Sequence, residues 1–230
     1  VEEYVRDRLR LKHSPEQIAG VAKKNGDKCV SHERIYQFIW QDKRKKGTLY
    51  LDLRNRGRRY KKRSVIYDKR GIIPNRTDIS QRPPEVELRE RFGDLEIDLI
   101  IGKNHKGAIL TINDRATGFG KLRKLDGKDA QQLATATIDC LMEWKPFLKT
   151  ITSDNGKEFA AHELVAKQLN IDFFFAKPYA SWQRGSNENY NRLVRQYIQK
   201  KVDFDCIPTD YINFVEYQLN NRPRKRFKYE

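Results

Sequence analysis

The chain has 230 residues, a formal net charge of +16 and a pI near 9.7. This length can bury the core of an ordinary domain and of a small second one, and this charge predicts a polyanionic partner, first of all nucleic acid. With three isolated cysteines, no signal-peptide pattern and no apolar run near the roughly 18 residues of a membrane helix, we expect a soluble intracellular protein without disulfides or a thiolate zinc site.

Residues 1–42 predict a small helical domain. Ser14, Pro15 and Gln17 form a capping-box start with proline at the first helical position, and a second helix begins after Ser31. An amphipathic N-terminal segment precedes both helices, so the unit is typical of a helix-turn-helix DNA-binding domain; an ordinary helical bundle is the alternative. The predicted contacts are to base edges from His32, Arg34 and Gln37, and to phosphates from Lys23, Lys24 and Lys28.

A basic linker is predicted over residues 43–91. Within it, residues 43–70 hold 13 basic and 2 acidic residues, a net charge of +11. One interpretation is a solvated, partly disordered charge run, and the other is a segment that follows DNA phosphates; the two are compatible. The phosphate contacts expected in this linker are Arg58, Arg59, Lys61 and Lys62.

Residues 92–230 predict an α/β domain, because short runs of branched and aromatic residues alternate with helical periodicity. The predicted strands are residues 95–101, 107–113, 118–124, 148–153 and 171–176. The predicted helices are residues 129–144, 160–169, 186–201 and 209–220. Three consecutive strands with short turns predict a meander, and the later strand-helix-strand units predict parallel additions. The expected fold is a mixed five-stranded sheet with helices on both faces.

Asp98 lies within LEIDLII, a segment typical of a buried central strand. Alternate strand residues share a face, so Glu96, Asp98 and Ile100 should point one way and their neighbours the other. An unpaired carboxylate in a buried strand is strongly destabilising, so Asp98 must meet a cation or a metal. Glu96 is its rival, interpreted as a salt-bridge partner or as a support for the metal ligands.

Asp154 opens the segment DNGKEF, directly after a predicted parallel strand. Open α/β sheets gather their ligands at such carboxyl ends, which favours a role in binding. The alternative role of Asp154 is to cap the helix that follows Asn155 and Gly156. Asn155 is expected to support the metal ligands without being one.

Glu188 lies at the start of a predicted basic helix, on one stripe with Arg192 and Arg195. The plain interpretation is a surface ion pair from Glu188 to Arg192, which contributes only tenths of a kcal/mol. The functional interpretation puts Glu188 on a metal, and Arg192, Arg195 and Lys177 on the phosphates of a DNA strand. Three carboxylates without a thiolate or a close pair of histidines suit Mg²⁺ or Mn²⁺.

Six blocks spread over nearly the whole chain resemble the transposases of the IS30 family of bacterial insertion sequences: SPEQIAG, VSHERIYQFIW, LEIDLIIG, TSDNGKEFAAHE, PYASWQRGSNENYNRLVRQY and LNNRPRKRF. The resemblance implies a retroviral-integrase-like, ribonuclease H fold with Asp98, Asp154 and Glu188 as a DDE triad. It also implies binding to terminal inverted repeats, transposition through a joined-end intermediate, and a bacterial, nucleoid-associated location. Because two DNA ends must be held together, at least a homodimer is expected.

Two features depart from the family pattern. Leu95 precedes Glu96 where members usually have an aromatic residue, and the further N-terminal helix-turn-helix that members usually carry is not in this sequence. Together with the missing initiator methionine and the abrupt end at Glu230, the second departure predicts that the sequence is a fragment.

The ligand set predicts two-metal chemistry at one phosphodiester, with the ions about 3.5 to 4 Å apart. Asp98 would bridge both ions, Asp154 would hold one and Glu188 the other. One ion would activate water for strand cleavage and the other would stabilise the departing 3′ oxygen, after which the freed 3′-OH attacks a new phosphate. The alternatives are a DNA-binding regulator on a catalytically idle ribonuclease H-like scaffold and a structure-selective nuclease.

Overall fold

The computed structural model describes four stretches of the chain, residues 1–56, 73–177, 181–200 and 202–230. It divides the chain into two compact units, one of residues 1–63 with 221–230 and one of residues 64–220. Across the described stretches, no helix is long and apolar enough to cross a membrane.

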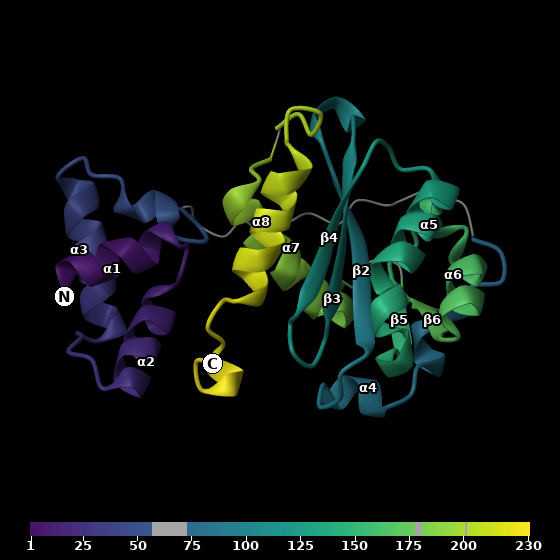
Figure 1. The fold of residues 1–230 in the computed structure, drawn as a ribbon, viewed down its shortest axis with the longest axis horizontal. Coiled ribbons are helices and arrows are strands. Elements are labelled where there is room, and N and C mark those ends of the chain that lie inside the picture. Colours follow the sequence, from purple (N-terminus) through teal and green to yellow (C-terminus); the bar gives the residue numbers. More distant parts are fainter. Residues whose placement is uncertain (57–72, 178–180, 201) are drawn as a thin grey trace. The chain divides into compact units, whose positions relative to one another are not determined.

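In its described residues, the first unit contains the α-helices α1 (Glu2–Arg10), α2 (Pro15–Asn25) and α3 (His32–Arg44) (Figure 1). The predicted capping box is present at the start of α2, where the Ser14 hydroxyl accepts from the Gln17 backbone N–H and the Gln17 side chain accepts from the Ser14 N–H. The apolar faces of the three helices meet in one small core, which contains Val5, Leu9, Ile18, Ile35, Ile39 and Leu53.

The last ten residues of the chain pack on α2 of this unit. The Arg222 Nε donates to the Gln17 Oε1 at 3.0 Å, and Lys24 forms an ion pair with Glu230 at 3.1 Å. The Tyr229 ring lies directly against Gly20, where an added Cβ would meet it at 2.2 Å. The predicted catalytic domain extended to residue 230, and the boundary differs because these contacts join segments about 200 residues apart, which no local pattern reports.

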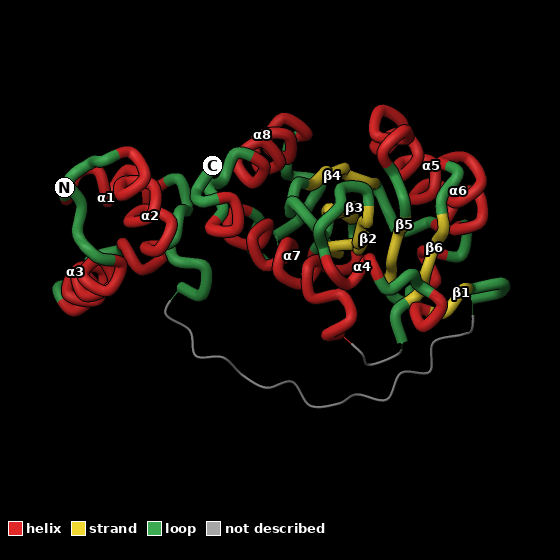
Figure 2. Tube along the Cα trace, turned by 90° about the horizontal axis from the view of Figure 1, so that it is seen from below, coloured by secondary structure: helices red, strands yellow, loops and turns green. Residues whose placement is uncertain are grey.

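The second unit is built on a mixed sheet of β1 (Thr77–Asp78), β2 (Asp94–Ile101), β3 (Ala108–Asp114), β4 (Gly120–Leu125), β5 (Thr150–Ser153) and β6 (Asp172–Phe175). Figure 2 shows its strand order, β1-β6-β5-β2-β3-β4. The meander β2-β3-β4 is antiparallel, whereas β5, β6 and β1 add in parallel. The five predicted strands are present, and the expectation of a five-stranded sheet is corrected by β1, whose two residues are too few to show alternation.

Helices cover both faces of the sheet, as predicted (Figure 1). On one face, α5 (Ala130–Leu141) and α6 (His162–Leu169) enclose the larger core with the strands. On the other, α7 (Gly185–Tyr197) and α8 (Thr209–Asn220) pack over β3 and β4. The helix predicted over 129–144 ends earlier, because Met142–Phe147, which contains Pro146, forms a 3-10 helix.

The described parts of the predicted linker are packed rather than free. Leu53 belongs to the core of the first unit, and Ile73 belongs to the large core of the second. The short helix α4 (Glu85–Leu88) buries Val86 completely. Isolated apolar residues thus anchor both ends of the charged stretch, which the charge count alone did not predict. The predicted DNA contacts Arg58, Arg59, Lys61 and Lys62 lie outside the described residues.

Candidate active site

Asp98 faces α7 from the middle of β2, on the side predicted for it. One carboxylate oxygen accepts from the Asn191 side-chain amide at 2.8 Å, and the other accepts from the Leu99 backbone N–H at 2.9 Å. Thr111 lies opposite Asp98 in β3, and its hydroxyl donates to the Asn191 Oδ1 at 2.8 Å. These contacts fix the orientation of a carboxylate that the strand would otherwise bury without a partner.

Asp154 follows the carboxyl end of β5, next to β2 in the sheet. Its Oδ1 accepts from the Gly156 backbone N–H at 2.9 Å, but the 3-10 helix Lys157–Phe159 has Gly156 as its N-cap and no side-chain cap, so the predicted capping role is absent. Its Oδ2 faces another group, the guanidinium of Arg184, at 3.6 Å. One oxygen of Asp154 is therefore held by this local backbone bond, and the other faces a cationic group.

Arg184 joins the two aspartates. It closes the 3-10 helix Ser181–Arg184 and is the N-cap residue of α7. Its Nη2 lies 3.4 Å from the Asp98 Oδ2 and donates to the Ile97 carbonyl at 2.8 Å, while its Nη1 faces Asp154. The sequence-based prediction missed Arg184, because a 3-10 helix of four residues is too short to show a periodic pattern.

The charges around Asp98 and Asp154 favour a bound cation. Burial raises the pKa of Asp98, Arg184 acts to lower it, and the neighbouring charge of Asp154 raises it further, so that the pKa lies above the ordinary aspartate value. Two carboxylates that repel each other and converge on one positive group also offer the all-oxygen ligand set that Mg²⁺ and Mn²⁺ prefer. Asp98 and Asp154 therefore fit a divalent ion.

Glu188 is exposed in the first turn of α7 and is not brought to the two aspartates. Among the described residues, no group of three His, Cys, Asp or Glu side chains is close enough to hold a metal. However, Glu188 shares a helical stripe with Arg184, Asn191 and Arg195, which all contact β2: Arg184 and Arg195 through backbone carbonyls, and Asn191 through Asp98. The third predicted ligand thus lies on the edge of α7 that borders β2.

Glu96 is fully buried, two residues before Asp98. Its Oε1 lies 2.8 Å from the Arg115 Nη1, which confirms the salt-bridge interpretation. Its Oε2 accepts from the Asn187 backbone N–H at 2.7 Å, in the first turn of α7. Arg115, which the sequence-based prediction missed, also binds Glu87 at 2.9 Å. Glu96 therefore attaches the start of α7, and with it Glu188, to the central strand.

Three relatives with known descriptions match this chain over almost its full length. A transposase for insertion sequence element IS4351 from Bacteroides fragilis is 56% identical over 221 residues, which are 96% of this chain and 68% of that protein. A transposase for IS1086 from Cupriavidus metallidurans is 34% identical, with 96% of this chain and 67% of that protein covered. The InsI transposase for IS30A from Escherichia coli K12 is 32% identical, with 98% and 61% covered.

The chain belongs to the IS30 family of insertion-sequence transposases. No model of a known protein family matches it. Two solved structures resemble this IS30-family chain weakly. The catalytic core domain of BIV integrase is 22% identical, with a TM-score of 0.43 over 57% of this chain and 84% of that one. A chain of a simian T-cell lymphotropic virus intasome in complex with PP2A regulatory subunit B56 gamma is 14% identical, with a TM-score of 0.47 over 55% of this chain and 48% of that one.

The residues predicted to contact DNA differ in their exposure and in their contacts within this IS30-family chain. In the helical unit, Lys23, Lys28, Arg34 and Gln37 are exposed, with Arg34 bound to Gln37 at 3.0 Å. His32 lies 2.8 Å from Glu33, and Lys24 is held by Glu230.

In the second unit, Lys177 and Arg192 are exposed. Arg195 is half-buried, burial lowers its pKa, and its guanidinium donates to the carbonyls of Gln199 and Ile101. Asn155 accepts from Arg76 and donates to the Ala176 carbonyl, so it ties the ends of β5 and β6 together. Arg195 and Asn155 are therefore engaged in contacts within the fold.

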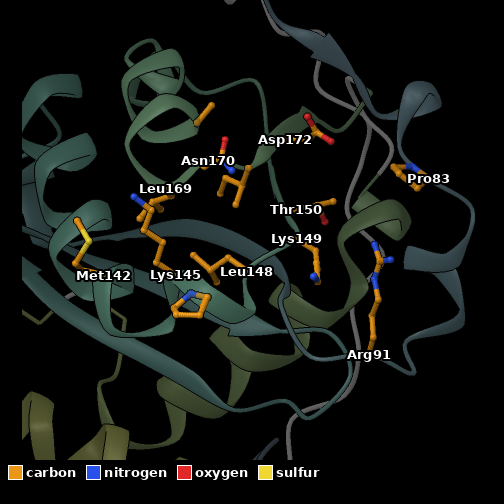
Figure 3. A pocket seen from close by; sticks show the side chains of 13 residues that line it. Pro83, Arg91, Met142, Lys145, Leu148, Lys149, Thr150, Leu169, Asn170 and Asp172 are labelled. Atoms are coloured by element: carbon orange, nitrogen blue, oxygen red, sulfur yellow. The ribbon is translucent and has the colours of Figure 1, made fainter.

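A hollow lies at the end of the sheet where β5 and β6 begin (Figure 3). It is lined by Thr150 and Asp172, the first residues of β5 and β6, and by the basic side chains of Lys145 and Lys149. Since Asp154 follows the opposite, carboxyl end of β5, this hollow is separate from the candidate active site of the transposase-family fold.

Proposed function

We propose that this chain is a DNA transposase that binds the terminal inverted repeats of an insertion sequence and catalyses metal-dependent DNA strand cleavage and strand transfer on a ribonuclease H-like fold. The observation that carries this proposal is the convergence of Asp98 and Asp154, from neighbouring parallel strands, on one cationic group. In a chain of this family, a half-buried pair of carboxylates on neighbouring parallel strands is best explained by phosphoryl transfer.

Glu188 is the third catalytic residue in this proposal. This role is supported by the position of Glu188 between residues that contact β2. Arg184 directly precedes α7, Asn191 and Arg195 lie on α7, and all three form hydrogen bonds to β2. A small rotation or shift of the helix start would bring the exposed Glu188 side chain toward the aspartates. The buried contact of Glu96 with the Asn187 N–H limits how far that start can move.

Two Mg²⁺ or Mn²⁺ ions, held by Asp98, Asp154 and Glu188, would supply activated water and neutralise charge on the departing 3′ oxygen. The chain's own residues prepare the site. Asn191 and the Gly156 N–H orient the two aspartate carboxylates, and the Oδ2 atom of each one faces Arg184. The preset geometry lowers the reorganisation needed when a phosphodiester arrives.

DNA is the proposed partner, held by both units. Arg34 and Gln37, with His32, would read base edges from the first half of α3, and Lys23, Lys24 and Lys28 would meet phosphates beside them. In the catalytic unit the proposed phosphate contacts are Lys177, Arg192 and Arg195, and Arg58, Arg59, Lys61 and Lys62 would serve the segment between the units. Cleavage of two ends at once requires at least a homodimer.

The test uses labelled inverted-repeat ends, the chain and Mg²⁺. We expect a nick at the element end, followed by joining of the 3′-OH to target DNA. Asp154→Asn should abolish cleavage and leave DNA binding within a few fold. The matched control is Asp172→Asn, the same change on an exposed residue at the start of β6, which should leave cleavage unchanged. Parallel loss of cleavage and binding in Asp154→Asn would make Asp154 a structural residue.

A DNA-binding regulator is the second candidate, favoured by the position of Glu188 away from the two aspartates. Binding to inverted repeats without nicking under any divalent ion would establish it. Cutting of RNA–DNA hybrids or junctions without preference for element ends would instead establish a structure-selective nuclease.

A further inference from the structure

Arg184 occupies the space between Asp98 and Asp154, where a bound cation would be expected. Its two terminal nitrogens lie 3.4 and 3.6 Å from one oxygen of each carboxylate. Its short hydrogen bond, 2.8 Å, goes instead to the backbone carbonyl of Ile97. The contacts to the carboxylates are therefore mainly electrostatic and longer than the bidentate bonds of a locked arginine–carboxylate pair.

The two carboxylates remain open to solvent beside the arginine. The Asp98 and Asp154 side chains are 28% and 35% exposed, whereas the Arg184 side chain is 11% exposed. The Arg184 Nε atom is buried and has no hydrogen-bond partner among the described residues. Ions can thus reach the acids from solvent, and the guanidinium is held by fewer bonds than it can make.

A divalent ion and this guanidinium exclude each other. Magnesium binds carboxylate oxygens at about 2.0 to 2.1 Å, in the space that the Arg184 nitrogens approach, and two cations on one pair of acids would repel each other. We propose that Arg184 is an internal cation that competes with divalent metal for Asp98 and Asp154. This inference rests on the proposed function, because it takes the two aspartates as the metal ligands.

This competition raises the concentration of divalent ion that is needed to fill the site. The apparent dissociation constant of the ion equals its intrinsic value divided by the fraction of molecules in which the arginine has left the pair. Arg184 is also the N-cap residue of α7 and lies one turn before Glu188. Its side chain makes no cap hydrogen bond to α7, so the guanidinium can leave the aspartates without breaking a cap bond of the helix that carries the proposed third ligand.

The test measures Mn²⁺ binding to the full chain without DNA, by the electron paramagnetic resonance signal of free Mn²⁺. Arg184→Gln should bind Mn²⁺ about tenfold more tightly, which corresponds to an arginine that occupies the pair about nine tenths of the time. Arg184→Lys, which keeps the charge, should fall between Arg184→Gln and the unaltered chain. Arg123→Gln removes an equal charge from the exposed side of β4 and should leave the affinity within twofold.

Thermal melting in EDTA and in Mn²⁺ provides the second measurement. Arg184→Gln should melt lower than the unaltered chain in EDTA and recover most of the difference in Mn²⁺, because the ion replaces the lost cation. A purely structural arginine would lower both melting temperatures equally. If Arg184→Gln does not fold, the Mn²⁺ affinity of Arg184→Lys decides the question.

The outcomes separate this inference from the proposed function. If Asp154→Asn loses Mn²⁺ binding but Arg184→Gln binds as the unaltered chain does, or more weakly, the competition is refuted and the active site stands. If Asp154→Asn and the unaltered chain bind Mn²⁺ equally, the aspartates are not the metal site, and the proposed function and this inference both fail.

Discussion

The two faces of β2 differ in polarity and in what packs against them. On one face, Leu95, Ile97 and Leu99 enter the apolar core that α5 and α6 enclose. On the other, Glu96 and Asp98 face α7, and only Ile100 returns to an apolar cluster. Because strand side chains alternate, the same eight residues hold the sheet together on one side and present carboxylates on the other.

The polar face is stable because each carboxylate has its own donors. Glu96 is matched by Arg115 and the Asn187 N–H, and Asp98 by Asn191 and Arg184. Without such partners a buried carboxylate would be strongly destabilising. The carboxylate-bearing side of the strand therefore requires a helix with matching donors, whereas the apolar side requires only volume.

The largest effect should follow from Asp98→Asn. Single-turnover cleavage should fall by about 1000-fold or more, because an asparagine neither bridges metal ions nor carries their counter-charge. The melting temperature should hold or rise, because burial raises the pKa of Asp98 and the neutral side chain avoids that cost. A variant that cleaves DNA normally would remove Asp98 from the chemistry.

Glu96→Gln should be next in size. It leaves the buried Arg115 without one of its charges, and loss of one partner from a buried pair costs about 3 to 5 kcal/mol of unfolding free energy. Urea unfolding measures this loss. The matched control is Glu143→Gln, which breaks an exposed pair with Lys121 and should cost less than about 1 kcal/mol. Equal losses would mean that burial of the Glu96 pair is not what matters.

On the apolar face, Ile97→Val should cost about 0.5 to 1.5 kcal/mol, because it removes one buried methylene. Its cleavage rate per folded molecule should match that of the unaltered chain. Paired with Asp98→Asn, this variant tests the division directly: adjacent residues should affect stability alone and activity alone. A specific loss of cleavage in Ile97→Val would show that the two faces are coupled.

The smallest expected effect is on the pH dependence of stability, and it comes from His13, a buried polar residue of the first unit. Burial, then the charges of Arg222 and Arg8, lower the pKa of His13 from 6.5 to about 4. Between these values the unfolded chain binds the proton and the folded unit does not, so stability falls as the pH drops through this window. At pH 6 the loss relative to pH 8 should be about 0.5 to 0.8 kcal/mol.

Hydrogen exchange of α2 and α3 amides at both pH values measures this loss. His13→Gln stays neutral throughout and should lose the difference. If the difference persists in His13→Gln, another group is responsible for it.

Local patterns predicted most of the second unit. Alternation placed Glu96, Asp98 and Ile100 on one face, and the strand bounds lie within two residues of the observed ones. What the patterns missed depends on distance in sequence. Arg115 comes from a turn and Arg184 from a short 3-10 helix, where no periodic pattern marks direction, and they meet β2 because the sheet and α7 bring them there.

The same limit applies at the ends of the chain. Charge counting predicted a linker to residue 91, but Ile73 belongs to the large core of the second unit and Val86 is completely buried. The sequence pattern predicts the helix that carries Glu188, but the distance of Glu188 from the aspartates depends on the side-chain conformation and on where the helix starts, which the pattern does not contain.

The packing of residues 221–230 on α2 makes the first unit a product of both chain ends. Cutting the backbone once between the two units would therefore not separate them. The released helices would stay attached through Arg222 and Tyr229, and a nicked protein should migrate as one species until it is denatured. Any truncation of the tail acts at the far end of the chain, on the fold of the helices and not on the sheet.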